Sequence, residues 1–226
     1  HLIIWFGEMF KKKPFFIVFE GIEGCGKSYQ SKKLFKNLKK KGLQTILTRE
    51  PGGTKGAEII RKLILKDYFH KKSKEQFDKY TDTLLYLAAR NEHIKNKIKP
   101  SLLKNKLVIC DRFIDSTIAY QVYGKKVNKA FINNIHKMIL NKIKPNLTII
   151  LTVNINKAIK RINKRKYKNR YDRFSKSFYS KVQKSFLKIA KNNKKNYLIL
   201  DNSNDDNNLE KRILRLVLKK IGFKNG

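Results

Sequence analysis

Residues Phe15 to Ser28 read FFIVFEGIEGCGKS, and this stretch decides the fold class of the 226-residue chain. Its first five residues form an apolar run typical of a buried strand. Residues 21–28 fit G-x-x-x-x-G-K-[ST], the P-loop pattern that binds phosphate groups. A helical pattern follows, with apolar Leu34 and Leu38 among lysines. The alternative is a chance glycine turn before a basic helix, and the strand in front of the loop favours the P-loop.

The residue types in this loop suit a nucleoside triphosphate. The glycines allow the backbone to curl so that its N–H groups point at phosphate oxygens, and the following helix adds the positive end of its dipole. Lys27 can reach the β- and γ-phosphates, and the Ser28 hydroxyl can bind Mg²⁺. The predicted ATP-binding residues are Gly21, Ile22, Glu23, Gly24, Cys25, Gly26, Lys27 and Ser28.

Two cysteines, Cys25 and Cys110, show neither metal-ligand spacing nor a disulfide framework. This usage fits a reducing, cytoplasmic compartment. Cys25 lies beside Lys27 and a helix N-terminus, which favour the thiolate, so we predict a reactive thiol. The alternative is a small buried hydrophobic residue.

Strands and helices alternate along the rest of the chain. Strands are predicted at 43–48, 107–110, 147–153 and 197–200, and helices at 57–65, 80–98, 114–123, 129–140, 155–165, 174–190 and 209–221. Pro100 is expected to end one helix, and 68–79 and 166–173 are expected to be loops. The pattern predicts an α/β fold of the P-loop NTPase type, a parallel five-stranded sheet with helices on both faces and a short lid.

The net charge of +37 is extreme. It indicates either a nucleic-acid or anionic-membrane partner, or a compositional drift toward Lys, Asn and Ile spread over the surface. The lysines are dispersed and greatly outnumber the arginines that read base edges, which favours drift. We therefore expect no specific nucleic-acid partner and no membrane partner.

Charged residues follow two further predicted strands. Asp111 ends an apolar strand, where a second carboxylate of P-loop enzymes holds Mg²⁺ or its water shell; the alternative is a helix N-cap. Arg112 beside it is a candidate phosphate clamp. Arg49 also lies just past a strand end, so both arginines face one crevice. Two arginines beside a P-loop indicate a second phosphorylated substrate instead of water.

Four sequence blocks carry a resemblance to a known family. The P-loop, T-R-E-P-G-G-T at 48–54, L-A-A-R at 87–90 and D-R-F-I-D-S-T-I-A-Y-Q at 111–121 closely resemble bacterial thymidylate kinases. The resemblance extends from Phe15 to the last helix. It implies transfer of the γ-phosphoryl group from Mg-ATP to dTMP, in dTTP biosynthesis, by a cytoplasmic homodimer. A single kinase domain would span 15–226, with a lid at about 161–173, after an N-terminal extension over 1–14 in which Met9 is the expected natural start.

Individual residues receive predicted roles from the motifs and from the resemblance. The P-loop and the strand end make Lys27, Asp111 and Arg112 the candidate catalytic residues, with Ser28 and Asp111 holding the metal. The resemblance implies the roles in substrate binding. Glu23 would bind the 3′-hydroxyl, Arg49 and Arg112 the dTMP phosphate, Tyr86 would stack on thymine, Arg90 would bind a thymine carbonyl, Thr117 and Gln121 would contact the base, and Tyr120 would pack near the sugar. For the tyrosines the alternative is ordinary core aromatics, and for Arg90 a solvated helix face.

Some relatives carry an arginine inside the P-loop, where this chain has Gly24. The charge that develops in the transition state then needs another cation, and we predict that Arg165 of the lid supplies it as a catalytic residue. Arg161 and Arg170 are alternatives to Arg165. A basic helix that is merely solvated, with no catalytic role, is the remaining alternative. Thr152 and Asn169 depart from acidic residues frequent in the family. Another nucleotide or nucleoside kinase on this fold, or a nucleic-acid-binding protein, remain the rival functions.

Overall fold

The computed structural model describes residues 13–66, 76–204 and 208–223. The predicted start at Met9 and most of the predicted 68–79 loop lie outside the described residues. None of the helices in the described ranges is both long and apolar enough to cross a membrane.

Five parallel strands form the central sheet. They are β1 (Phe15–Glu20), β2 (Thr45–Arg49), β3 (Leu107–Asp111), β4 (Leu147–Thr152) and β5 (Tyr197–Asp201), in the order β2-β3-β1-β4-β5. The order reverses at β1, which lies between β3 and β4, and ligands of such sheets bind at the carboxyl ends beside this reversal. Asp111 pairs in register with both Phe19 and Arg49. The P-loop, Arg49 and Asp111 therefore leave the sheet at one level.

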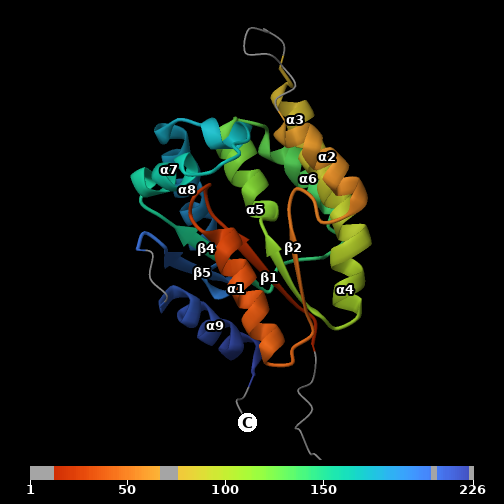
Figure 1. Ribbon diagram of the computed structural model, residues 1–226. Helices are drawn as coiled ribbons and strands as arrows, with labels where there is room; N and C mark the ends of the chain where they lie inside the picture. The colour runs from red at the N-terminus through yellow and green to blue at the C-terminus, as the bar shows by residue number, and fades with distance from the viewer. Residues whose placement is uncertain (1–12, 67–75, 205–207, 224–226) are drawn as a thin grey trace, which may run out of the picture.

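The apolar run of β1 is buried on both faces, which explains why it does not alternate with polar residues. Ile17 and Phe19 belong to the cluster that includes Leu34 of α1 (Lys27–Lys40), whereas Phe16 and Val18 pack with other residues. α1 and α9 (Asn208–Ile221) lie together in front of the sheet (Figure 1). The remaining α-helices are α2 (Lys55–Leu65), α3 (Lys79–His93), α4 (Lys99–Leu103), α5 (Ile114–Thr117), α6 (Lys129–Ile139), α7 (Ile155–Asn163) and α8 (Lys176–Lys191).

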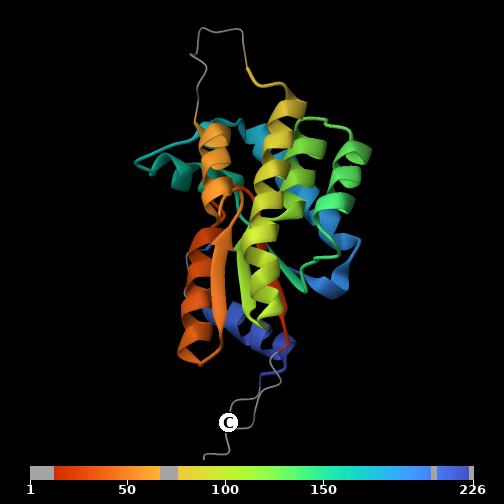
Figure 2. The same cartoon turned by 90° about the vertical axis from the view of Figure 1, so that its right-hand side faces the viewer.

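Pro100 does not end the predicted helix at 80–98. α3 continues through a π-helical turn, Ile94–Ile98, into α4, and Figure 2 shows one long helical column. Pro100 stands in the first turn of α4, where the π-helical turn has already displaced the regular hydrogen-bond ladder and the missing N–H is tolerated. The predicted helix at 114–123 likewise starts as α5 and continues as a π-helical turn, Ile118–Gly124.

The predicted lid is more ordered than expected. α7 ends at Asn163, two residues before the helix end predicted at residue 165. A 3-10 turn, Arg170–Arg173, occupies the end of the predicted 166–173 loop. Asn169 caps this turn, because its side chain accepts from Tyr171 N while Asp172 accepts from Asn169 N.

Candidate active site

One cavity of about 520 Å³ opens at the carboxyl ends of the strands. The P-loop, the β2–α2 loop, α3, the β3–α5 segment and the lid all contribute to its walls. The predicted residues that line it are Glu23, Lys27, Ser28, Arg49, Tyr86, Arg90, Asp111, Arg112, Thr117, Tyr120, Gln121 and Arg165. Five predicted P-loop positions, Gly21, Ile22, Gly24, Cys25 and Gly26, lie outside the lining.

The P-loop is shaped by close approach of the backbone of α7. Gly24 has φ +74°, and a Cβ there would lie 2.5 Å from the carbonyl oxygen of Ala158. Only glycine fits, because both the dihedral angle and the rigid neighbour exclude a side chain. Lys27, which is buried, donates from Nζ to Ile22 O at 3.0 Å and so reaches back across the loop.

Two side chains hold the loop from behind. Arg161 of α7 donates to Gly24 O at 3.0 Å and to Asn202 O at 2.8 Å. Asn202, which follows β5, donates to Cys25 O at 2.7 Å. These bonds occupy backbone carbonyls of the loop and orient the peptide units whose N–H groups are needed for phosphate.

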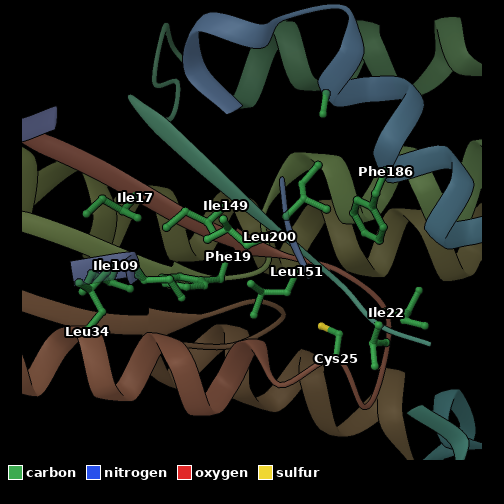
Figure 3. Close-up of a cluster of buried hydrophobic side chains, with 14 of the residues drawn as sticks. Ile17, Phe19, Ile22, Cys25, Leu34, Ile109, Ile149, Leu151, Phe186 and Leu200 are labelled. Atoms are coloured by element: carbon green, nitrogen blue, oxygen red, sulfur yellow. The ribbon is translucent and has the colours of Figure 1, made fainter. Parts of the chain in front are cut away.

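Cys25 is not a reactive thiol, and that prediction is wrong. Its side chain is fully buried, and Figure 3 shows its sulfur inside the apolar cluster near Ile22 and Leu151. Burial raises the pKa of the Cys25 thiol, against the charge of Lys27. The loop presents its backbone to the cavity and turns this side chain into the core, so the alternative of a small buried hydrophobic residue is confirmed.

Ser28 and Asp111 form the pair that would hold Mg²⁺. The Ser28 hydroxyl donates to Oδ2 of Asp111, while the buried Oδ1 of Asp111 has no hydrogen-bond partner among the described residues. Mg²⁺ commonly takes one or two protein oxygens and completes its shell with phosphate and water, so this pair fits the ion. The N-cap alternative for Asp111 is wrong, because α5 starts after Phe113 and has no side-chain cap.

Arg112 lines the cavity and is bonded to the P-loop. It has φ +73° and donates from Nη1 to Gly21 O at 3.0 Å and from Nη2 to Glu23 Oε1 at 2.6 Å. Tyr120 donates to the other oxygen of Glu23, and its ring lies 5.1 Å from the Arg112 guanidinium carbon. Arg112 is thereby fixed against the P-loop, where it lines the cavity.

Arg61 is a cavity residue that the sequence analysis missed. It donates to Pro51 O at 2.6 Å, and burial together with the nearby charge of Arg49 lowers its pKa. Arg49 itself is half exposed and bound to Glu58 at 3.0 Å. The available signal was periodicity: Arg61 lies four residues after the buried Ala57, on the inward face of α2.

Arg90 is buried, and the alternative of a solvated helix face is wrong. It donates from Nε to Glu50 at 2.7 Å and from Nη2 to Phe113 O at 2.9 Å. Nη1 contacts Thr117 Oγ1 at 2.8 Å and His136 Nε2 at 2.7 Å. Although burial favours a neutral acid, the charge of Arg90 and the bonds to Glu50 hold the pKa of that carboxyl below its ordinary value.

Next to Arg90 the cavity has an aromatic wall and an unused acceptor. The Tyr86 ring lies edge-on to Tyr171, with centroids 6.0 Å apart. Gln121 is 1% exposed, and its buried Oε1 has no hydrogen-bond partner among the residues described. A flat polar ring that donates a hydrogen bond would satisfy this oxygen.

The family profile described as "Thymidylate kinase" matches residues 19–213. The thymidylate kinase of Mycoplasma capricolum is 36% identical over 91% of this chain and 95% of its own length. That of Wolbachia pipientis subsp. Culex pipiens is 40% identical over 91% of this chain and 96% of its own. A crystal structure of thymidylate kinase from Ehrlichia chaffeensis covers 91% of this chain and 99% of that one, with a TM-score of 0.70 and 32% identity.

This chain belongs to the thymidylate kinase family. Its reaction is the phosphorylation of dTMP to dTDP with ATP as the donor. The predicted family, the α/β fold with its parallel five-stranded sheet and the predicted kinase reaction are confirmed. The roles of single residues in the thymidylate kinase reaction stay predictions.

Three lid arginines are candidates for a second cation at the phosphates, in addition to Lys27 of the P-loop. Of the three, only Arg165 lines the described cavity, where it is bound to the buried Asp172. Arg161 is committed to Gly24 O, and Arg170 is bound to Asp82.

Proposed function

We propose that this thymidylate kinase binds ATP at the P-loop end of the cavity and dTMP at the α3 end. The observation that carries the proposal is that one cavity is lined both by Lys27 and Ser28 of the P-loop and by Arg90 and Gln121. Arg112 links the two groups, because it donates to Gly21 O of the P-loop while the next residue, Phe113, accepts from Arg90. The transferred phosphoryl group would cross at this point, and positioning plus charge neutralisation would supply most of the catalysis.

Ser28 and Asp111 would hold Mg²⁺ at the donor phosphates. The unused Oδ1 of Asp111 supports this assignment. When bound, the ion neutralises phosphate charge and orients the γ-phosphoryl group. Lys27 would bind the β- and γ-phosphates through the ammonium N–H groups that Ile22 O does not use.

Arg49 and Arg112 would bind the acceptor phosphate, and Arg61 adds a third cation on the same side. No strong general base is required, because a phosphate monoester with a second pKa near 6 is largely a dianion at neutral pH. Glu23, fixed by Arg112 and Tyr120, would accept from the 3′-hydroxyl of the sugar. Tyr120 would pack beside that sugar.

Thymine matches the polar groups at the α3 end. Of the five N–H groups of Arg90, the four bonds described above leave one on Nη2, which can donate to the thymine O4. The free Oε1 of Gln121 can accept from N3–H. Cytosine presents an acceptor at N3 and a donor at N4, so both contacts would oppose it. Tyr86 would stack on the ring, and Thr117 would contact the base edge.

An acceptor panel of dTMP, dUMP, dCMP, dGMP and AMP tests the proposal. We expect dTMP to be preferred and Arg90→Ala to raise the KM for dTMP far more than the KM for ATP. Equal effects on both constants, or preference for a purine monophosphate, would exclude the proposed dTMP site. Steep salt-dependent binding of DNA without kinase turnover would favour the rival class.

We further propose that the enzyme is a homodimer of the cytoplasm. Large apolar side chains are exposed on the adjacent helices α2 and α3, with Ile59 at 63% and Leu84 at 47%. The two free thiols are both buried, which suits a reducing compartment. Light scattering after gel filtration should give twice the chain mass, and Ile59→Lys should give a monomer; a monomeric wild type would exclude the dimer.

A further inference from the structure

His136 is a buried histidine to which the reaction so far gives no role. It lies in α6, is 6% exposed, and does not line the cavity. Its Nε2 lies 2.7 Å from Nη1 of Arg90. α6 thus places one imidazole directly behind the side chain that faces the base.

The contacts of Arg90 leave it one free direction. Both N–H groups of Nη1 are used, one by Thr117 and one by His136, while Nε is used by Glu50. With Phe113 O on Nη2, four partners around the planar guanidinium fix its plane as well as its position. Without His136, one buried N–H of Nη1 loses its acceptor. The guanidinium then shifts toward another acceptor, and the remaining N–H of Nη2 is no longer held in one direction.

His136 can serve only as an acceptor here. Nε2 faces a permanent donor, so the ring must be neutral and carry its proton on Nδ1. Burial and the positive charge of Arg90 lower the pKa of His136 to about 3. The imidazole therefore keeps the acceptor form at neutral pH.

We propose that His136 is a positioning residue of the acceptor site, which holds Arg90 so that its one free N–H is directed at a carbonyl of the bound pyrimidine. This inference rests on the proposed role of Arg90. It makes His136 a determinant of base selectivity that touches no substrate.

The test compares His136→Leu, which removes the acceptor, with His136→Gln, whose Oε1 can occupy the position of Nε2. Loss of a hydrogen bond to a charged group should raise the dTMP KM about ten- to hundredfold in the leucine variant, with kcat and the ATP KM little changed. The ratio of kcat/KM for dTMP to that for dCMP should fall as well. His136→Gln should restore most of both. Met138→Leu, on the exposed side of the same helix, is the control and should change neither.

A purely structural role would lower activity with dTMP and dCMP alike and leave their ratio unchanged, which would overturn the proposal. If His136→Leu does not fold, ¹⁵N NMR of the wild type decides: we expect a neutral Nδ1–H ring from pH 5 to 8, and an imidazolium or an Nε2–H ring would overturn it. Arg90→Ala distinguishes failure of the proposed base site from failure of the role of His136. If Arg90→Ala leaves the dTMP KM unchanged, both the base site and this inference are wrong. If Arg90→Ala raises the dTMP KM but His136→Leu does not, only this inference is wrong.

Discussion

Replacement of Glu50 by glutamine should be one of the most costly single-atom changes in the molecule. Glu50 lies between Arg90 at 2.7 Å and His93 at 3.1 Å, with side-chain exposures of 4%, 2% and 0%. Glutamine keeps the shape but removes the charge and turns one oxygen into a donor that faces a donor. Breaking a buried ion pair from one side costs about 3–5 kcal/mol. Because His93 can change tautomer, we expect about 3 kcal/mol, or a fall of about 6–12 °C in Tm for a chain of this size.

Urea unfolding measures this cost, provided that the slope m is unchanged. The matched control is Glu58→Gln, a few residues further along the same segment. Glu58 pairs with Arg49 at 3.0 Å, but the two side chains are 37% and 54% exposed. An exposed pair of this kind contributes less than about 1 kcal/mol. Glu58→Gln should therefore lower the free energy of unfolding several-fold less than Glu50→Gln.

The pH dependence of stability gives a second test, because its sign follows from the pKa of Glu50. The pKa of Glu50 is held below its ordinary value in the folded state, so the stability that its charge contributes is present above the unfolded pKa and is lost as pH falls through the folded pKa. The gap between wild type and Glu50→Gln should be constant near neutral pH and should shrink in acid. Equal costs at positions 50 and 58, or a gap that widens in acid, would refute this account of the network.

Three further outcomes follow from the site. Lys27→Ala should abolish turnover while the thermal melt stays close to wild type, because the lost charge faces the transferring group; ADP production near the wild-type rate would exclude the P-loop assignment. Arg165→Met should lower kcat about 10³-fold with little change in the dTMP KM; no effect there, with the loss appearing in Arg161→Met or Arg170→Met, would move the role. Mass spectrometry should find Cys25 unmodified by iodoacetamide in the folded enzyme and alkylated in urea, and rapid alkylation of the native enzyme would contradict its burial.

Much of the cavity was predictable because its residues follow apolar runs. The P-loop, Arg49 and Asp111 each come directly after a strand, and the carboxyl ends of parallel strands meet at one edge of the sheet. Any parallel pairing puts them at the same edge, and the order β2-β3-β1 makes these strands neighbours. The strands were predictable because burial on both faces gives short continuous apolar runs. Most helix positions were predictable because one buried face gives apolar residues a helical spacing.

The supporting contacts could not be predicted in this way. His136 is 46 residues from Arg90 in the sequence, and only the packing of α6 beside α3 joins them. Cys25 shows the opposite failure, since its sequence neighbours indicated a thiolate but the packing around Leu151 and Ile22 decided its environment. Local pattern fixes which elements form, whereas the direction of a single side chain depends on neighbours far away in sequence.

The net charge of the chain does not show that many of its few acidic residues lie in the interior. Among the residues that the structure describes, six acidic side chains are buried: Glu20, Glu23, Glu50, Asp82, Asp115 and Asp172. Between Asp115 and Asp201 the sequence has only one acidic residue, Asp172, and it is among these six and binds Arg165. Four of the six pair with an arginine: Glu23 with Arg112, Glu50 with Arg90, Asp82 with Arg170 and Asp172 with Arg165. The net charge of +37 therefore lies chiefly on the surface. The proposed phosphoryl transfer depends instead on the paired charges around the cavity, which the net charge does not reveal.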